Sequence, residues 1–319
     1  MESELKRVAA VVVTYNRKAL LRECLDALMA QEYPEMEILV IDNGSGDGTG
    51  ELVRERYQAA SRFPLRNYNT GRNLGGAGGF NFGMKKAMEG GCGWLWLLDD
   101  DCIVRPDSLK ALMREAEGPG EKAGFLCSRV LWQDGSLCRM NIPWVSYREK
   151  ISETERGVVP VIMATFVSFL VSRKRVEEFG FPISDFFIWA DDMEYSRRIS
   201  RKYPGRYVGE SQVLHKTRTN IGSNLVLDAA PDLSRYRYAY RNEYYVYRRE
   251  GLPGRLFYFA KRMFHRTKIL LKSDRKRERL RILNRAVREG KRFHPGIETV
   301  PKGASPTEAG KTQQDSPST

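Results

Sequence analysis

Residues 94–101 read Trp94-Leu95-Trp96-Leu97-Leu98-Asp99-Asp100-Asp101, an apolar run that ends in three aspartates. The run is as short as a buried strand, and Gly93 and Arg105-Pro106 bound it. An isolated acidic triplet could be a solvated turn. Crowded carboxylates repel one another, however, and Mg²⁺ or Mn²⁺ takes carboxylate oxygens as ligands. Because open α/β sheets bind ligands at the carboxyl ends of their strands, the position of the triplet favours a cation and its ligand.

The chain before this run alternates between strand-like and helix-like segments. Strands are predicted at 8–13, 37–41, 65–68 and 94–98, with helices at 18–31, at 49–60 and up to residue 89. Four such alternations predict an α/β fold built on a doubly wound parallel sheet. From about residue 120 the pattern loosens, and a long β-prone stretch covers residues 158–171.

The composition indicates a globular protein with a reduced interior. The 319 residues are 41% hydrophobic, enough for a full α/β domain and an appendage. The five cysteines form no C-x-x-C pair, which favours a cytoplasmic setting over a disulfide framework. The segment after Met1 has no apolar signal region, and no stretch reaches the ~18 apolar residues that a membrane span needs. We therefore expect a protein that is neither exported nor membrane-spanning.

The net charge of +13 is concentrated near the C-terminus, because residues 261–293 hold 14 Lys and Arg against 3 Asp and Glu. This asymmetry predicts an anionic partner, either a membrane or a nucleic acid. Apolar residues three or four apart in this region indicate one stripe on a helix: Leu256, Phe259, Ala260, Met263, Leu270 and Leu271. Such a helix suits an anionic bilayer; the alternative is a helix packed on the protein with its cations in water.

Two further motifs have both a structural and a functional interpretation. Asp42 ends the second predicted strand among turn-forming residues, but in a nucleotide-binding sheet a carboxylate there accepts a hydrogen bond from a base or ribose. Thr14 and Tyr15, at the end of the first strand, would face the same crevice. The glycines from Gly75 to Gly79 form neither a Walker loop nor a dinucleotide fingerprint. They either bring a ligand close to a helix N-terminus or let a helix pack tightly on the sheet.

A second acidic cluster, Asp191-Asp192, follows four aromatic or apolar residues that end at Trp189 and Ala190. The pair either interacts with a helix dipole or supplies a general base. Burial would raise the pKa of such a carboxylate, whereas a helix N-terminus or a metal would lower it. His215 ends another β-prone segment and is either a structural histidine or a metal ligand.

These motifs, in this order over about residues 6–250, resemble the family 2 glycosyltransferases, which adopt the GT-A fold. The resemblance is carried by residues 11–17, 40–45, 99–101 and 191–192. It implies that Thr14 and Asp42 meet the nucleotide base, that Asp101 meets the metal-diphosphate together with Asp99, and that Asp192 deprotonates the acceptor hydroxyl. It also implies a mainly parallel central sheet flanked by helices, followed by a helical, basic C-terminal region.

One branch of the family fits best. The segment Asn73-Leu74-Gly75-Gly76-Ala77-Gly78-Gly79-Phe80 most resembles enzymes that transfer galactofuranose, in which a distal histidine, here His215, completes the metal site. Rhamnosyltransferases share a looser form of this segment. The chain lacks the large added domains of polymerising galactofuranosyltransferases, so one or a few additions are expected.

The resemblance therefore predicts an inverting, metal-dependent enzyme that transfers galactofuranose from UDP-galactofuranose. The acceptor would be a glycan or a lipid-linked molecule in cell-surface polysaccharide synthesis. The alternative donor is dTDP-rhamnose. Asp99, Asp101 and His215 would hold Mn²⁺ or Mg²⁺, Asp192 would be the base with Asp191 next in line, and Trp189 would meet the acceptor. The residues expected at the donor are Thr14, Tyr15, Arg17, Asp42, Asn73, Gly75, Gly76, Asp99 and Asp100.

A nucleic-acid-binding protein is the rival from another class. It explains the basic C-terminal region but not the acidic motifs, and no recognition module accompanies the charge, so no nucleic-acid partner is expected. The expected organisation is a catalytic domain over residues 1–233, a helical, membrane-associating region over 234–300, and a disordered tail over 301–319. The expected location is cytoplasmic and peripheral on the inner face of the cell membrane.

Overall fold

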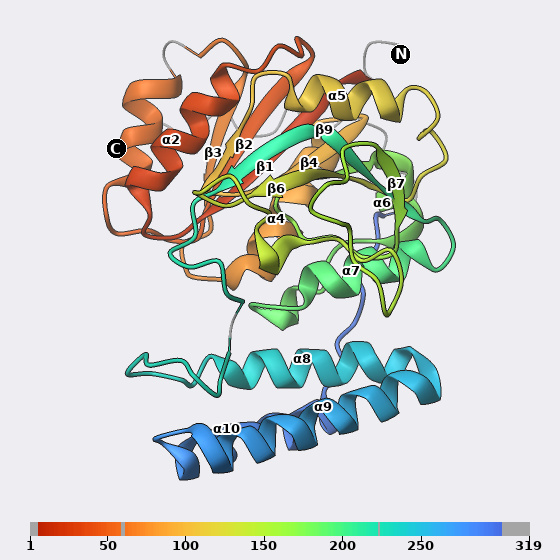
Figure 1. Cartoon of the computed structure of the whole chain (residues 1–319). Helices are drawn as coiled ribbons and strands as arrows, with labels where there is room; N and C mark the ends of the chain where they lie inside the picture. The colour runs from red at the N-terminus through yellow and green to blue at the C-terminus, as the bar shows by residue number, and fades with distance from the viewer. Residues whose placement is uncertain (1–5, 59–60, 223, 302–319) are drawn as a thin grey trace.

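The computed structural model describes residues 6–58, 61–222 and 224–301. Within these residues nine strands form one sheet, in the order β3-β2-β1-β4-β8-β6-β9-β5, with β7 paired to β9 (Figure 1). The strands are β1 (Val8–Thr14), β2 (Met36–Asp42), β3 (Leu65–Asn69), β4 (Trp94–Asp99), β5 (Cys102–Val104), β6 (Leu126–Leu131), β7 (Val158–Val161), β8 (Phe169–Ser172) and β9 (Gly205–His215).

The four predicted strands are all present, and they lie parallel to one another. Strand β1 pairs with both β2 and β4, so that Thr14 lies opposite Asp42, and Val13 opposite Asp99. Beyond β4 the sheet is mixed, because β8 runs antiparallel to β4 and β6, whereas β6 and β9 run parallel. The order of the strands reverses between β1 and β4, which is where open α/β sheets form their ligand crevice.

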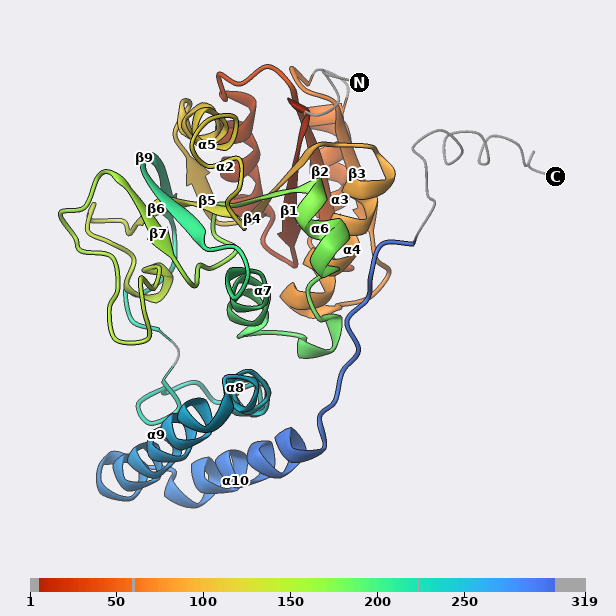
Figure 2. The ribbon, with the colours of Figure 1, turned by 90° about the vertical axis from the view of Figure 1, so that its right-hand side faces the viewer.

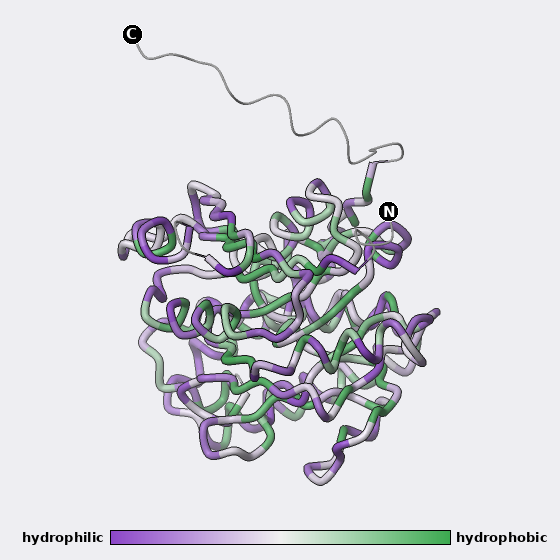
Figure 3. Tube along the Cα trace, turned by 90° about the horizontal axis from the view of Figure 1, so that it is seen from above, coloured by the Kyte–Doolittle hydropathy of each residue, from purple (hydrophilic) through white to green (hydrophobic). Residues whose placement is uncertain are grey.

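Helices cover both faces of the sheet. They are α2 (Lys18–Met29), α3 (Thr49–Val53) with the π-helical turn η1 (Arg54–Gln58), α4 (Gly75–Glu89), α5 (Ser108–Ala116), α6 (Arg173–Phe179) and α7 (Asp191–Ser200). Because side chains alternate along a strand, Val8, Ala10 and Val12 pack against α2 and α5, while Ala9 and Val11 pack against α4 and α7. The apolar segments accordingly gather in the interior (Figure 3).

The stretch 158–171 is not one strand. It divides into β7 and β8, and Ser168, just before β8, adopts a positive φ of 59°. The hydroxyl of Ser168 meets the indole nitrogen of Trp96 at 2.9 Å in the core. A run of β-prone residues thus predicted strand character correctly but could not reveal the irregular segment within it.

Three helices follow the sheet and form a separate layer below α7 (Figures 1 and 2). They are α8 (Tyr236–Arg249), α9 (Gly251–Lys272) and α10 (Lys276–Arg292). Among the described residues, no helix combines the length and the apolar character that crossing a membrane would require.

The helical layer is packed on the rest of the protein through α8 and through the chain after α10. Tyr245 and Val246 of α8 share a core cluster with Ala77 of α4 and with Phe186. The chain then runs back beside the sheet layer, where the Glu298 carboxylate accepts a hydrogen bond from Asn81 at 3.0 Å (Figure 2). The boundaries at residues 233 and 300 remain predictions, and the tail from residue 302 lies outside the described residues.

Candidate active site

One cavity of about 770 Å³ lies at the carboxyl ends of β1 and β4. Every residue that the sequence analysis predicted for the site lines this cavity, except Asp42. Its lining includes Thr14, Tyr15, Arg17, Asn73, Gly75, Gly76, Asp99, Asp100, Asp101, Trp189, Asp191, Asp192 and His215. Strand pairing explains how a distant histidine arrives there, because His215 at the end of β9 lies opposite Cys102 of β5, one residue after the aspartates.

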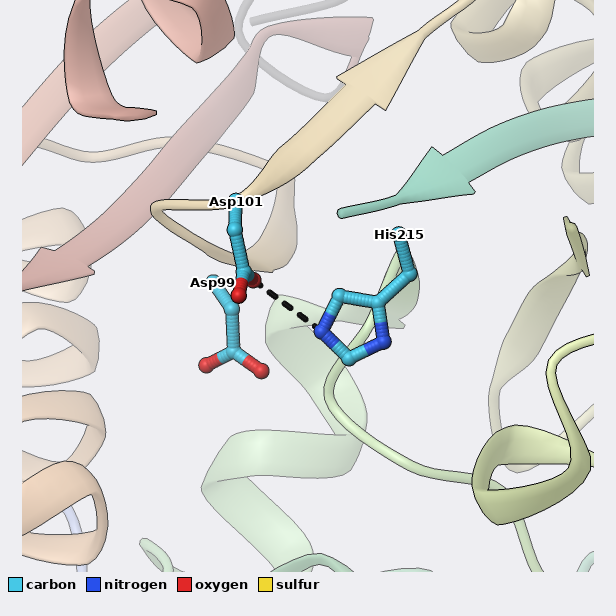
Figure 4. A group of neighbouring side chains, drawn as sticks. All are labelled: Asp99, Asp101 and His215. Atoms are coloured by element: carbon cyan, nitrogen blue, oxygen red, sulfur yellow. Dashed lines mark ion pairs between the residues drawn. The ribbon is translucent and has the colours of Figure 1, made fainter. Parts of the chain in front are cut away.

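Asp99, Asp101 and His215 converge in this cavity (Figure 4). One ligand atom of each lies within 4.8 Å of the other two. The buried Asp101 Oδ1 atom faces His215 Nε2 at 3.0 Å and has no other hydrogen-bond partner among the described residues. Two carboxylates and an imidazole that converge in this way fit a divalent cation such as Mn²⁺ or Mg²⁺.

The histidine is oriented by a residue that the sequence did not reveal. His215 Nδ1 lies 2.8 Å from Oδ1 of Asn141, and Asn141 belongs to the 3₁₀ turn η2 (Arg139–Asn141). Because an amide oxygen only accepts, Nδ1 carries the hydrogen, which directs Nε2 toward Asp101 as a metal ligand would require.

The charges in this group depend on one another. Burial raises the pKa of Asp99 to about 7, and the Asp101 carboxylate adds to that shift. Burial alone would lower the pKa of His215, but the contact with Asp101 outweighs the effect of burial and raises the pKa to about 10. Protons and a divalent cation would therefore compete for the same atoms.

Asp100 has a different environment from its two neighbours. Its carboxylate accepts a hydrogen bond from the Thr14 hydroxyl at 2.7 Å and another from Arg17 at 3.1 Å. Arg17 also contacts Asp101 at 2.9 Å. Asp100 thus ties the ends of β1 and β4 together and holds the Arg17 cation at the cavity. The donor-binding roles of Thr14, Arg17 and Asp100 remain predictions.

The glycine segment packs closely on the rest of the protein, and its role in bringing a ligand near the helix N-terminus remains a prediction. A Cβ at Gly75 would lie 2.0 Å from the carbonyl oxygen of Phe187, and its φ is +72°, so this position requires glycine. Gly79 and Gly83 allow α4 to pack on the sheet, because a Cβ at either would press on Val13 or Val11. Gly76, by contrast, lines the cavity with open space around it.

Asp191 and Asp192 begin helix α7 and line the same cavity. Burial raises the pKa of Asp192 to about 6, although its hydrogen bond from the backbone N–H of Met193 opposes the shift. Burial, and then the charge of Asp192, raises the pKa of Asp191 as well. At neutral pH Asp192 is therefore ionised yet close to the pKa of an effective general base.

The loop before α7 is strained and is held by helix α8. Phe187, Trp189 and Ala190 have positive φ angles of 64°, 67° and 64°. Asn242 of α8 is fully buried, and its side-chain amide donates to the carbonyls of Phe186, Ile188 and Trp189 at 3.0, 3.0 and 2.9 Å. In the sequence Asn242 lies between Arg241 and Glu243 in a tyrosine-rich segment, where no pattern marks it as different from its polar neighbours.

Trp189 lines the cavity and packs on Tyr236 at 5.2 Å between ring centroids. The cavity wall also includes Trp144, Lys150 and Met163, which the sequence analysis did not select. They come from the irregular region between β6 and β8, where no periodic pattern marks them. The acceptor role of Trp189 remains a prediction.

Asp42 ends β2 as expected, but its carboxylate is buried in its own loop. It accepts hydrogen bonds from the backbone N–H of Ser45 at 2.8 Å and from Asn69 at 3.3 Å. The neighbouring Asn43 lines the cavity in its place and donates to the carbonyl of Gly75 at 3.0 Å. The role of Asp42 at the nucleotide base therefore stays a prediction.

Known proteins are similar to this chain in sequence, and others are similar to it in fold. Galactofuranosyltransferase GlfT1 of Mycolicibacterium smegmatis is 28% identical over 261 residues, covering 77% of this chain and 84% of that protein. GlfT1 of Mycobacterium tuberculosis is 29% identical over 263 residues, covering 77% and 83%.

Among solved structures, S. aureus TarS 1-349 matches with a TM-score of 0.53 at 15% identity, covering 90% of this chain and 72% of that one. Mannosyltransferase PcManGT from Pyrobaculum calidifontis, in complex with GDP-Man and Mn²⁺, matches with a TM-score of 0.53 at 16% identity, covering 90% and 76%. These likenesses confirm the predicted GT-A fold. The family model "Glycosyl transferase family 2" matches residues 9–176, slightly more than half of the chain. The protein is therefore a member of glycosyl transferase family 2.

Proposed function

We propose that this enzyme is an inverting, metal-dependent galactofuranosyltransferase that uses UDP-galactofuranose and adds the sugar to a glycan or lipid-linked acceptor in cell-surface polysaccharide synthesis. The observation that carries the proposal is that the group Asp99, Asp101 and His215 shares one cavity with the carboxylate of Asp192. A single bound donor would thus have its diphosphate at one wall and its anomeric carbon facing the other.

In the proposed reaction Asp192 takes the proton from the acceptor hydroxyl, and the hydroxyl oxygen attacks the anomeric carbon. The bond between that carbon and the diphosphate oxygen breaks, and UDP leaves with the electron pair. A divalent cation held by Asp99, Asp101 and His215 would supply Lewis-acid neutralisation of the diphosphate. Arg17, held at 2.9 Å from Asp101, adds a cation of the protein's own at this wall.

The donor sugar is supported by the GlfT1 relatives, which cover most of both chains. We further propose that residues 1–233 supply the catalytic residues and residues 234–300 complete the site through Asn242. No observation in the structure favours the rhamnose donor over galactofuranose.

The test is a donor screen with the full chain and Mn²⁺, measuring release of the nucleotide diphosphate from UDP-galactofuranose, dTDP-rhamnose and UDP-galactopyranose. The Asp192→Asn variant serves as the control for enzymatic turnover. We expect UDP-galactofuranose to be turned over fastest and the rate to require the cation. Faster release from dTDP-rhamnose would overturn the donor assignment, and equal rates after chelation would overturn the metal dependence.

A further inference from the structure

Helix α9 directs an apolar face outward, away from the rest of the protein. Leu252, Leu256, Phe259, Leu270 and Leu271 are between 46% and 73% exposed. At helical spacing they share one side of α9 with Ala260, Met263 and Phe264, while Tyr258 and Ile269 face inward and are buried. The stripe that the sequence predicted is therefore exposed, whereas the opposite side of α9 packs on α8 and α10.

Cations flank this apolar face. Arg255, Arg262 and Arg266 are spaced seven and four residues apart, so they lie along one edge of α9. In the portion of the chain that the structure describes, no carboxylate forms an ion pair with any of the three. By contrast, Lys261 on the inner side is paired with Glu243 at 2.7 Å. The unpaired charge is thus placed beside the apolar stripe.

A small basic cavity of about 220 Å³ opens between α8, α9 and α10 at that edge. Its lining includes Arg248, Arg255, Arg262, Lys291, Tyr258 and Phe259. The Nε atom of Arg262 is buried and has no hydrogen-bond partner among the described residues. Several guanidinium and ammonium groups around an aromatic floor suit a phosphate oxygen, for which arginine is the preferred side chain.

We propose that α9 docks on an anionic phospholipid bilayer, with its apolar face in the acyl boundary and a lipid phosphate in the basic cavity. A second copy of the chain fits less well, because an antiparallel two-fold contact through this face would bring the basic edges of the two copies together. A nucleic acid would use the cations and leave the leucines and phenylalanines exposed to water. The inference does not depend on the donor or on the reaction.

The experiment measures co-sedimentation of the full chain with liposomes of phosphatidylcholine alone or mixed with phosphatidylglycerol. One variant carries Leu256→Ser, Phe259→Ser and Leu271→Ser, and its matched control carries Ile221→Ser and Leu227→Ser, which are as exposed but lie off α9. A second variant carries Arg255→Gln, Arg262→Gln and Lys291→Gln. Its charge-matched control carries Lys122→Gln, Arg148→Gln and Lys174→Gln, all exposed on the sheet layer.

We expect binding only to the anionic liposomes, with excess inorganic phosphate unable to displace the protein. The apolar variant should bind at least ~10-fold more weakly. The cation variant should bind on the order of 100-fold more weakly, about 5-fold per cation removed. Both controls should bind like the wild type. Thermal unfolding and turnover on a water-soluble acceptor should be unchanged in all variants; the single change Leu271→Ser serves if the triple variant unfolds.

Three results would overturn the proposal. Equal binding to neutral liposomes would exclude a role for anionic lipid. Unchanged liposome binding in the apolar variant, with DNA binding lost in the cation variant, would make the surface a nucleic-acid site. A lipid-free dimer that the apolar variant dissociates would make it a contact between copies of the chain.

Discussion

Replacing Asn242 with leucine should disable the enzyme without affecting its donor site. The side chain is fully buried and its amide donates to three carbonyls of the loop before α7. Leucine keeps the volume but removes both N–H groups. The carbonyl of Phe186 retains a hydrogen bond from Arg241 at 3.2 Å, whereas the carbonyls of Ile188 and Trp189 lose the donor that Asn242 provides.

The size of the effect follows from these two carbonyls. A buried acceptor left without its donor costs about 1–3 kcal/mol, so the folded state should lose roughly 2–6 kcal/mol if the loop stays in place. The loop can recover part of this lost free energy by relaxing the positive φ angles at Trp189 and Ala190, because each strained residue costs on the order of 1–3 kcal/mol. Relaxation moves Asp192, and a displacement of about 1 Å at a catalytic group lowers turnover on the order of 10²-fold.

The assay combines denaturant unfolding, kcat for sugar transfer and the Kd for UDP with Mn²⁺. We expect lower stability and lower kcat with an unchanged Kd, because the metal group lies at the ends of β4 and β9 and in the turn after β4, rather than on this loop. Tyr245→Phe is the matched control on the same helix, since its hydroxyl is buried and has no hydrogen-bond partner within residues 6–58, 61–222 and 224–301, so its removal should be harmless. Wild-type kcat in a folded Asn242→Leu protein would refute the positioning role.

Three further predictions concern the cavity itself. Asp192→Asn should keep UDP affinity but lower turnover by a factor on the order of 10², and near-normal turnover in this variant would move the base to Asp191. Because burial raises the pKa of Asp192 to about 6, kcat/KM of the wild type should fall as the pH drops through that value and the carboxylate is protonated. Asp101→Ala should abolish Mn²⁺-dependent UDP binding and His215→Ala should weaken it in calorimetry, whereas unchanged binding in His215→Ala would make that histidine structural. Gly75→Ala should reduce both stability and kcat, because its Cβ would overlap the Phe187 carbonyl. Gly76→Ala, with open space around its Cβ, should instead change only the KM for the donor. A stability loss in Gly76→Ala with a changed KM alone in Gly75→Ala would contradict these two roles.

The parts of the site that the sequence predicted share a physical origin. Thr14, Asp99 and His215 each end an apolar or β-prone strand. The periodicity of the sequence identifies these strands, and the carboxyl ends of parallel strands meet at one edge of a sheet. The register then brings Thr14 opposite Asp42 and His215 beside the aspartates. Short-range patterns therefore sufficed to place the ends of these strands, whereas His215 was predicted to be a metal ligand only through the family resemblance.

Other residues were not predictable because their roles exist only in the folded chain. Asn141 lies in a 3₁₀ turn without periodicity, and it matters because β9 brings His215 to it. Asn242 is 50 residues beyond the aspartate that it helps to position. Asp42 shows the converse, because its place in the motif was evident while the turn that occupies its carboxylate was not.

The apolar stripe of α9 shows the same limit for surfaces. Periodicity identifies the residues that share a face, but the direction of that face depends on what else is available to cover it. Here Tyr240 of α8 and Leu283 of α10 complete the inner core with Ile269, so the stripe turns outward. Because α8 also carries Asn242, the proposed docking helix and the loop before Asp192 contact the same element. Bilayer docking of α9 would thus be expected to stabilise the active loop, and turnover of a lipid-linked acceptor should depend on α9 more strongly than turnover of a water-soluble one.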